Sequence, residues 1–236
     1  MRVIHISDWH GNLQPIPEAD LYVVTGDMLP NFPDVYNNGS YVTYKIKPML
    51  EFTGQHRWCE SLSLGGGFRD FLGSPDAPLV CVRGNHDFID LSTMFDGCNL
   101  IHEFVDNEFI VVPGLNVNIT GHRGIPYIYG SWNDEESRAD LKDRMRRMPH
   151  ADIYLTHYAP SGILDASAPP DEGFVTDYGA AHHYGLEGMA DELLYRSTKG
   201  LHCFGHIHEC GGLVKKIGNV SFSNAATAVN VIDIDI

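Results

Sequence analysis

Residues 78–87 read Pro-Leu-Val-Cys-Val-Arg-Gly-Asn-His-Asp, and this stretch decides the fold. Its apolar part, residues 78–82, predicts a buried strand that stops at Gly84. An amide, an imidazole and a carboxylate follow at once in Asn85, His86 and Asp87. Buried polar groups without partners cost about 1–3 kcal/mol each, so these three side chains need partners. Because ligands bind at the carboxyl ends of strands in open α/β sheets, we expect this stretch to form one wall of an active site.

Other apolar runs of the chain end in the same way. Each is followed by side chains that bind metals: Asp8 and His10 after residues 2–7, Asp27 after residues 21–25, His157 after residues 152–156, and His206 and His208 after residues 201–204. Residues two apart, such as Asp8 and His10, point to the same side if the chain stays extended, which suits the binding of one ion. One polar strand end is usually only a turn. Together the strand ends favour a metal centre, because a stable core would leave all these groups without partners.

The composition predicts one globular domain that spans residues 1–236. The chain is 43% hydrophobic and 20% charged, which is ordinary for a protein with a sizeable core. It has no run of about 18 apolar residues that could cross a membrane, and its first residues already read as a strand, so we expect neither a membrane span nor a signal peptide. The five cysteines form no CxxC motif, which disfavours a cysteine zinc site. Odd, scattered cysteines fit a reduced, cytoplasmic compartment.

The net charge of -15 restricts the partners of this protein. Such a surface repels polyanions, so nucleic acid is disfavoured as a partner, although not excluded. The exception is local, because Arg144, Arg146 and Arg147 lie in one segment. We interpret this cluster as a solvated helix face.

Further elements complete an α/β pattern. We expect helices from a cap at Asn133 or Asp134 to about Met148 and over residues 186–198, with a short helix over residues 88–95. Strands are expected over residues 109–112, 117–120 and 127–129 as an antiparallel meander, and over residues 213–217, 219–222 and 229–236 at the end of the chain. Residues 30–56 lack a clean period and predict a long loop or an irregular insertion. Residues 57–72 read as partly helical, with a break at residues 65–67.

The ordered motifs DxH at 8–10, GD at 26–27, GNHD at 84–87, a single histidine after a strand, and GHxH at 205–208 resemble the calcineurin-like metallophosphoesterases. The resemblance implies an α/β fold of four layers, an αββα sandwich, with a dinuclear site at the carboxyl ends of the central strands. Carried over by position, it implies one ion held by Asp8, His10, Asp27 and His208, and a second ion held by Asp27, Asn85, His157 and His206. His86 would be the histidine that binds no metal and faces the substrate.

This ligand set implies a particular chemistry. Two divalent ions about 3.5–4 Å apart can share a bridging hydroxide and hold the phosphoryl oxygens for in-line attack. His86 would act as the general acid on the leaving oxygen. Oxygen and imidazole ligands without thiolate suit Mn²⁺, Fe or Zn²⁺, and the sequence does not choose among these metals. Because bound ions override the local sign of the charge, the site would attract a small phosphate ester even within an acidic protein.

Departures from the known subfamilies narrow the prediction. After Gly26-Asp27 the chain reads Met-Leu-Pro, without the Asp-Arg of the serine/threonine phosphatases, the tyrosine of the purple acid phosphatases, the histidine of the repair nucleases, or the second aspartate of many cyclic-nucleotide phosphodiesterases. The carboxyl half is most similar to the small MPPED-like group. The matching motifs are THYAP at 156–160, FGHIHE at 204–209 and SNAAT at 223–227. This similarity implies a phosphodiesterase acting on cyclic nucleotides and other small diesters.

Three alternatives stay open at this point: a phosphomonoesterase, a nuclease on single-stranded ends, and a weakly active regulatory or binding module. The roles of Asp87, His182, His183 and the segment 30–56 are not assigned, although Asp87 is a candidate to orient His86. The remaining histidines are interpreted as ordinary core or surface residues: His5, His56, His102, His122, His150 and His202.

Overall fold

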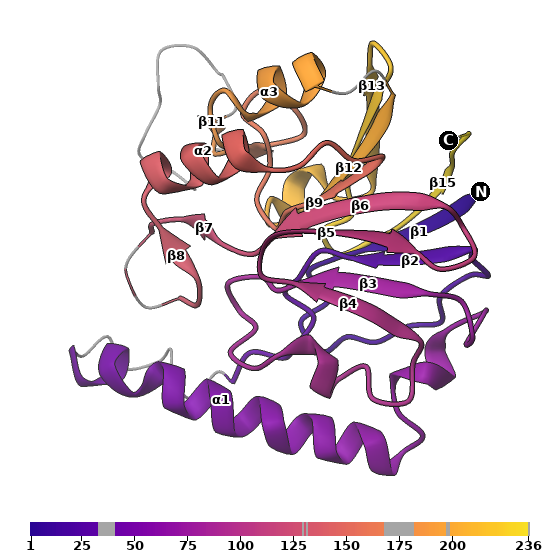
Figure 1. Ribbon diagram of the computed structural model, residues 1–236. Coiled ribbons are helices and arrows are strands. Elements are labelled where there is room, and N and C mark those ends of the chain that lie inside the picture. Colours follow the sequence, from indigo (N-terminus) through magenta and orange to yellow (C-terminus); the bar gives the residue numbers. More distant parts are fainter. Residues whose placement is uncertain (33–40, 129, 131, 168–181, 197–198, 236) are drawn as a thin grey trace.

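A five-stranded sheet carries the amino-terminal half of the site (Figure 1). The structure, a computed structural model, describes residues 1–236 except for 33–40, 129, 131, 168–181, 197–198 and 236. The strands of this sheet follow one another in the order β15 (Val229–Asp233), β1 (Arg2–Ile6), β2 (Leu21–Val24), β3 (Leu79–Val82) and β4 (Leu100–Phe104). Strands β1 to β4 are parallel, and β15 is antiparallel to β1. The carboxyl ends of β1, β2 and β3 therefore lie at one edge of the sheet.

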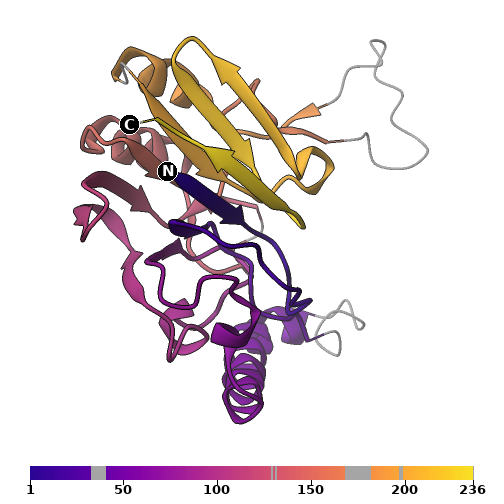
Figure 2. The same ribbon diagram turned by 90° about the vertical axis from the view of Figure 1, so that its right-hand side faces the viewer.

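A six-stranded sheet carries the other half. Its strands follow in the order β13 (Leu213–Ile217), β14 (Val220–Asn224), β12 (Gly200–Phe204), β9 (Ile153–Leu155), β6 (Val117–His122) and β5 (Asp106–Val112). The four inner strands are parallel, whereas β13 and β5 are antiparallel at the two margins. The two sheets are neighbouring layers in both views of the molecule (Figures 1 and 2).

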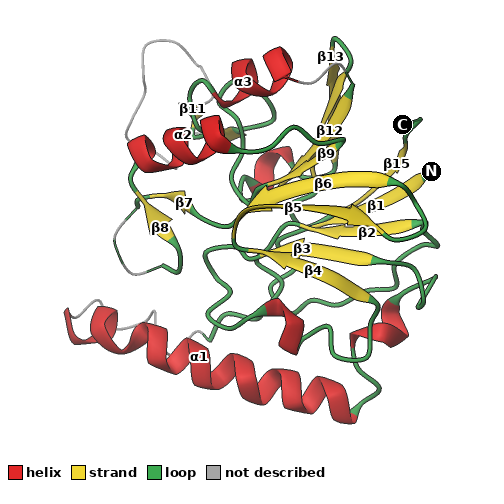
Figure 3. Ribbon diagram, in the orientation of Figure 1, coloured by secondary structure: helices red, strands yellow, loops and turns green. Residues whose placement is uncertain are grey.

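Apolar contacts join these sheets and the helices outside them into four layers. Val23 and Val80 of the first sheet belong to the same buried cluster as Leu155 and Cys203 of the second. Helix α1 (Tyr41–Leu64) covers the outer face of the first sheet, and α2 (Arg138–Arg147) and α3 (Met189–Arg196) cover the outer face of the second (Figure 3). Each fully buried aliphatic side chain stabilises such layers by about 1.5–3 kcal/mol. The expected αββα sandwich is thus confirmed. Among the described residues, no helix combines the length and the apolar character needed to cross a membrane.

The prediction for residues 30–56 was wrong from residue 41 onward, because α1 begins at Tyr41 and continues to Leu64, whereas residues 33–40 lie outside the described chain. The reason lies on its inner face. Lys47, Glu51, Gln55 and Cys59 are buried at a spacing of four residues, so the side of the helix that packs inward is largely polar. A helix of this kind has no apolar stripe to reveal its period. The expected break at residues 65–67 does end the helix.

Smaller elements also differ from the prediction. Helix α2 begins one turn later than expected, because the hydroxyl of Ser137 accepts from the Asp140 N–H and caps it. Strand β8 (Glu135–Glu136) takes up the first residues of the expected helix and pairs with β7 (Ile125–Pro126). A strand at 127–129 is not formed by the described residues of that range, and residue 129 lies outside the described chain. The meander ends after β5 and β6, since β6 pairs in parallel with β9.

Residues 88–95 contain only the short 3₁₀ helix Leu91–Thr93, and β4 was not predicted. Residues 197–198 of the last expected helix are also outside the description.

Three histidines, His5, His122 and His202, are fully buried within the sheets, as expected for core residues. Both ring nitrogens of His5 and of His122, and Nε2 of His202, make short contacts with neutral partners. These partners are the hydroxyls of Ser223 and Thr25 for His5, the Asn107 amide and the Tyr158 hydroxyl for His122, and the Thr156 hydroxyl for His202. Burial lowers the pKa of each ring to about 3. The folded protein therefore holds these imidazoles neutral at pH values where free histidine is charged.

This burial predicts instability in acid. Because the folded pKa values lie below the ordinary 6.5, unfolding takes up protons once the pH falls below 6.5, and stability is lost as the pH falls toward 3. Each ring lowers the free energy of unfolding by up to about 1.4 kcal/mol per pH unit. We expect His202→Gln to remove about that much from the slope, measured by urea unfolding followed by circular dichroism between pH 7 and pH 4.5. An unchanged slope would show that His202 does not titrate on unfolding.

Candidate metal centre

The predicted strand ends meet at one edge of the sandwich, where the two sheets lie together. The side chains concerned come from the loops after the parallel strands: Asp8 and His10 after β1, Asp27 after β2, Asn85 and His86 after β3, His157 after β9, and His206 and His208 after β12. Their donor atoms form three overlapping groups, each within 4.8 Å: Asp8, His10 and His208; Asp27, His157 and His206; and His10, Asp27 and His86. Side chains up to 200 residues apart in the chain are thus neighbours here.

The backbone brings these side chains together by left-handed turns and not by strand alternation. Asp8, His10, Asp27 and His206 have φ values of 56°, 46°, 52° and 69°. The condition under which Asp8 and His10 would point to the same side, an extended chain, is therefore not met. Such conformations cost most residues about 1–2 kcal/mol and are held by the surrounding structure. As a result, His206 and His208 belong to different donor groups although they are two residues apart.

The glycines in these motifs are required by close packing of the loops. A Cβ atom at Gly84 would overlap the carboxylate of Asp27, and a Cβ atom at Gly205 would overlap the carboxylate of Asp8. A side chain at either position would push a carboxylate out of the site. The GNHD and GHxH motifs therefore each place their glycine against an acidic side chain from a neighbouring loop.

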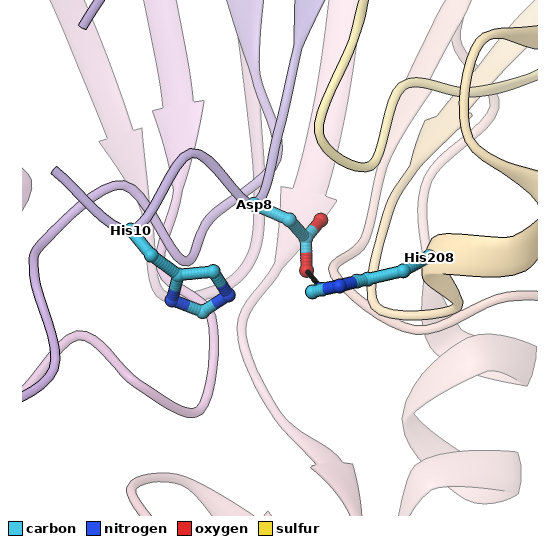
Figure 4. Close-up of side chains that lie close together, drawn as sticks. All are labelled: Asp8, His10 and His208. Atoms are coloured by element: carbon cyan, nitrogen blue, oxygen red, sulfur yellow. Dashed lines mark hydrogen bonds and ion pairs between the residues drawn. The ribbon is translucent and has the colours of Figure 1, made fainter. Parts of the chain in front are cut away.

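The first donor group contains Asp8, His10 and His208 (Figure 4). The Asp8 carboxylate accepts from the Ser7 hydroxyl at 2.6 Å and from the backbone N–H of His206 at 3.0 Å, and it lies 3.2 Å from Nε2 of His208. Burial alone would raise the pKa of Asp8, but the nearby charge of His157 and the contact with His208 lower it. The carboxylate is thus held ionised at a position that is almost fully buried.

The second donor group is centred on Asp27, which is also buried and ionised. Nε2 of His157 lies 3.2 Å from the Asp27 carboxylate and 3.1 Å from Oδ1 of Asn85. Nδ1 of His157 donates to the carbonyl oxygen of Thr25 at 2.6 Å, which directs Nε2 toward these oxygens. Although burial opposes it, the charge of Asp27 raises the pKa of His157 to about 10. Protein without bound ions therefore pairs this carboxylate with an imidazolium.

His86 lies beside both groups. Its Nε2 is 3.9 Å from the Asp27 carboxylate, and its backbone N–H donates to the other oxygen of Asp27 at 2.7 Å. Its ring contacts Trp132, with 4.0 Å between the ring centroids, and its Nδ1 is 2.5 Å from Oδ1 of Asn31. Burial lowers the pKa of His86 to about 4. Neither Asn31 nor Trp132 belongs to a motif, so sequence reasoning did not find them.

This arrangement fits divalent cations on chemical grounds. Two buried carboxylates, Asp8 and Asp27, form ion pairs within 4 Å only with histidine rings among the described residues, and Lys47 acts on Asp27 from farther away. The donors around them are imidazole nitrogens and amide or carboxylate oxygens, which suit Mn²⁺, Fe or Zn²⁺. His157 also has the outer hydrogen bond to a backbone carbonyl that metal-binding histidines usually make.

Asp87 does not touch the ring of His86, so its suggested role in orienting that ring is not what the structure has. Its carboxylate instead accepts from three backbone N–H groups: those of Asp27 at 2.6 Å, Gly84 at 2.9 Å and Leu29 at 3.0 Å. Asp87 thereby fastens the GNHD loop to the loop of Asp27. Burial raises its pKa to about 7.

We expect Asp87→Asn to lower the free energy of unfolding by about 2 kcal/mol or more, because an amide presents N–H groups to backbone donors that are buried. Urea unfolding measures this loss. The matched control is Asp76→Asn, which alters an exposed ion pair with Arg69 and should change stability by less than about 1 kcal/mol. Equal effects of the two substitutions would contradict the fastening role.

Other candidates from the sequence lie outside the donor groups. The side chain of His183 contacts the buried carboxylate of Asp165 at 2.6 Å, and the side chain of His182 lies outside the described chain. Glu209 accepts from the Ser167 hydroxyl. Asn224 donates to the carbonyl oxygen of Ile207 at 3.0 Å, which fastens the GHxH loop from β14.

One comparison with known proteins identifies a family. A family model described as calcineurin-like phosphoesterase matches residues 1–210. No curated protein matches the chain. Among solved structures, the phosphopantetheinyl hydrolase PptH from Mycobacterium tuberculosis is similar at 13% identity and a TM-score of 0.47, with 99% of this chain and 96% of that chain covered. The sulfate thiohydrolase SoxB from Thermus thermophilus is similar at 10% identity and a TM-score of 0.44, with 95% of this chain and 51% of that chain covered. Identities this low leave the substrates of those two hydrolases without bearing on this chain.

Proposed function

The chain belongs to the calcineurin-like phosphoesterase family and is a metal-dependent phosphoesterase, and from this premise we propose that it hydrolyses small phosphodiesters, nucleotides or cyclic-nucleotide-like compounds among them. The observation that carries the proposal is the pair of donor groups around the buried carboxylates Asp8 and Asp27, with the ring of His86 beside them and in contact with Trp132. We take residues 1–236 to act as one domain, because a single buried cluster joins both sheets.

We assign the donor groups to two ions. Asp8, His10, Asp27 and His208 would hold one ion, and Asp27, Asn85, His157 and His206 would hold the other. When bound, two divalent ions would polarise the phosphoryl oxygens and lower the pKa of water at the site. The chain itself contributes fixed ligands, because the left-handed turns and the glycine contacts leave the carboxylates little freedom to move.

His86 supports hydrolysis from the side of the leaving group. It is held at its backbone by Asp27 and at its ring by Asn31, so Nε2 keeps its place 3.9 Å from the Asp27 carboxylate. From there it can donate a proton or a hydrogen bond to the oxygen that departs. The ring of His86 also belongs to a group of possible metal ligands with His10 and Asp27, so it could instead bind an ion. Metal content of a His86 variant separates these two roles.

Small diesters are favoured as substrates by motif and by charge. The THYAP, FGHIHE and SNAAT motifs resemble the MPPED-like phosphodiesterases. A net charge of -15 disfavours polymeric nucleic acid. The arginines of α2 do little to attract nucleic acid, because Arg144 pairs with Glu136 and Asp106, and Arg147 pairs with Asp143.

The test is hydrolysis with added Mn²⁺, Fe²⁺ or Zn²⁺. Bis(p-nitrophenyl) phosphate, p-nitrophenyl phosphate, cyclic nucleotides and single-stranded DNA are compared under the same conditions. We expect kcat/KM for the diester to exceed that for the monoester by about tenfold or more, which corresponds to about 1.4 kcal/mol. A preference for the monoester would establish a phosphomonoesterase, and cleavage of DNA alone would establish a nuclease. Absence of any hydrolysis with all three metals would leave the binding module as the function.

A further inference from the structure

The side chain of Asn31 lies between two histidine rings of the site. Its Oδ1 is 2.5 Å from Nδ1 of His86, and its Nδ2 is 3.3 Å from Nδ1 of His10. The two rings are in edge contact, with 4.8 Å between their centroids. One carboxamide therefore contacts Nδ1 of two histidines that have different expected roles: His10 as a metal ligand and His86 as a proton donor.

A carboxamide can satisfy such a pair in only two ways, because one end accepts hydrogen bonds and the other end donates them. In the observed orientation Oδ1 accepts from a protonated Nδ1 of His86, and Nδ2 donates to a bare Nδ1 of His10. Turning the amide over exchanges these requirements. If both Nδ1 atoms were protonated, one of the two N–H groups would face the NH₂ of the amide, which is itself a donor. If both Nδ1 atoms were bare, the amide oxygen would face a nitrogen lone pair and accept no hydrogen bond.

The ring of His86 has little freedom to avoid this choice. Gln55, which is fully buried on α1, donates from Nε2 to the carbonyl oxygen of His86 at 2.6 Å and accepts at Oε1 from the N–H of Phe88 at 2.8 Å. The N–H of His86 is held by Asp27, and its ring packs on Trp132. Gln55 Nε2 also lies 3.4 Å from the carbonyl oxygen of Pro30, next to Asn31. The backbones on both sides of the contact are thus tied to the same helix.

We propose that Asn31 is a positioning residue that couples the tautomers of His10 and His86, so that a proton on Nδ1 of one ring places the proton of the other ring on Nε2. No proton enters or leaves the pair in this exchange. The catalytic meaning rests on the proposed function, in which Nε2 of His86 faces the leaving group. Only the form with the proton on Nε2 can donate there while the ring is neutral.

The coupling gives His10 control over His86. If His10 binds a cation through Nε2, its remaining proton is on Nδ1, and the amide must turn its oxygen toward His10. Nδ2 then faces His86, and the His86 proton moves to Nε2. His86 would thus become a donor in the state in which the neighbouring ligand position is filled.

The experiment reads the tautomers directly. Two-bond ¹H–¹⁵N correlation spectra of ¹⁵N-histidine-labelled protein distinguish protonated from bare ring nitrogens, and the loss of signals in His10→Ala and His86→Ala assigns the two rings. Spectra are recorded at pH 8.5, with chelator and with Zn²⁺. In the native chain we expect opposite Nδ1 states of the two rings in each sample. Asn31→Asp can accept from both rings, so both Nδ1 atoms should then be protonated. Asn31→Leu should leave His86 as a mixture of tautomers.

The outcomes separate this inference from the proposed function, because no substrate is present. Nδ1 atoms that are both protonated or both bare in the native chain would overturn the coupling, as would an Asn31→Asp protein that keeps the opposite pattern. Coupled tautomers in a protein that hydrolyses no phosphate ester would leave the inference standing and refute the function. Amide spectra of the same samples show whether each variant is folded.

Discussion

Asp27→Asn should abolish phosphoesterase activity and most of the metal binding. Asp27 belongs to two of the three donor groups, and it is the residue assigned to both ions. The substitution removes the negative charge of Asp27 but keeps nearly the same side-chain shape, so the loss of activity measures the contribution of that charge. Metal ions supply several kcal/mol of transition-state stabilisation, and a loss of about 4 kcal/mol corresponds to about 10³-fold in kcat/KM.

The matched control for this substitution is Asp20→Asn. Asp20 lies just before the amino end of β2, and Asp27 follows its carboxyl end. Its carboxylate accepts from the Arg2 N–H at the surface, so the control should keep full activity and metal content. Metal content is measured by elemental analysis after dialysis. An Asp27→Asn protein that keeps both ions and its turnover would exclude Asp27 as a shared ligand.

His86→Ala should lower kcat by about 10²- to 10⁴-fold and leave the metal content unchanged, because general acid catalysis contributes an amount of this size. The deficit should be larger for a phenyl ester than for a p-nitrophenyl ester, since a poorer leaving group depends more on the donated proton. Steady-state kinetics on the two esters and elemental analysis of the same samples measure both effects. Loss of an ion in parallel with kcat would make His86 a ligand.

The strands and the polar residues at their ends were predictable because their signals are local, whereas the four layers were implied by the family resemblance. Apolar runs such as Leu79–Val82 reveal a strand, and a polar residue directly after each run reveals a strand end. The strand ends were expected to gather because ligands bind at the carboxyl ends of strands in such sheets, whereas the resemblance to the calcineurin-like metallophosphoesterases implied which side chains would share an ion. The left-handed turns at Asp8 and His206 were not predictable, since a short motif fits an extended chain equally well.

The supporting contacts were not predictable because they join residues that are far apart in the chain. Gln55 reaches His86 across 31 residues, and Asp87 reaches Asp27 across 60. Gln55 belongs to no motif, and the GNHD motif does not indicate which backbone groups Asp87 would bind. The same holds for α1, whose buried face carries Lys47, Glu51 and Gln55 where a sequence pattern would require apolar residues.

Because Gln55 of α1 is hydrogen-bonded to the backbone of His86, a change in the position of this outer helix should change the rate of turnover. Met49 and Phe52 are exposed on the same helix, within two turns of Gln55. A rigid helix passes a tilt at its surface directly to a hydrogen bond at its buried face. In directed evolution, substitutions on the outward side of α1 would therefore be selected as rate changes, although they contact neither substrate nor metal.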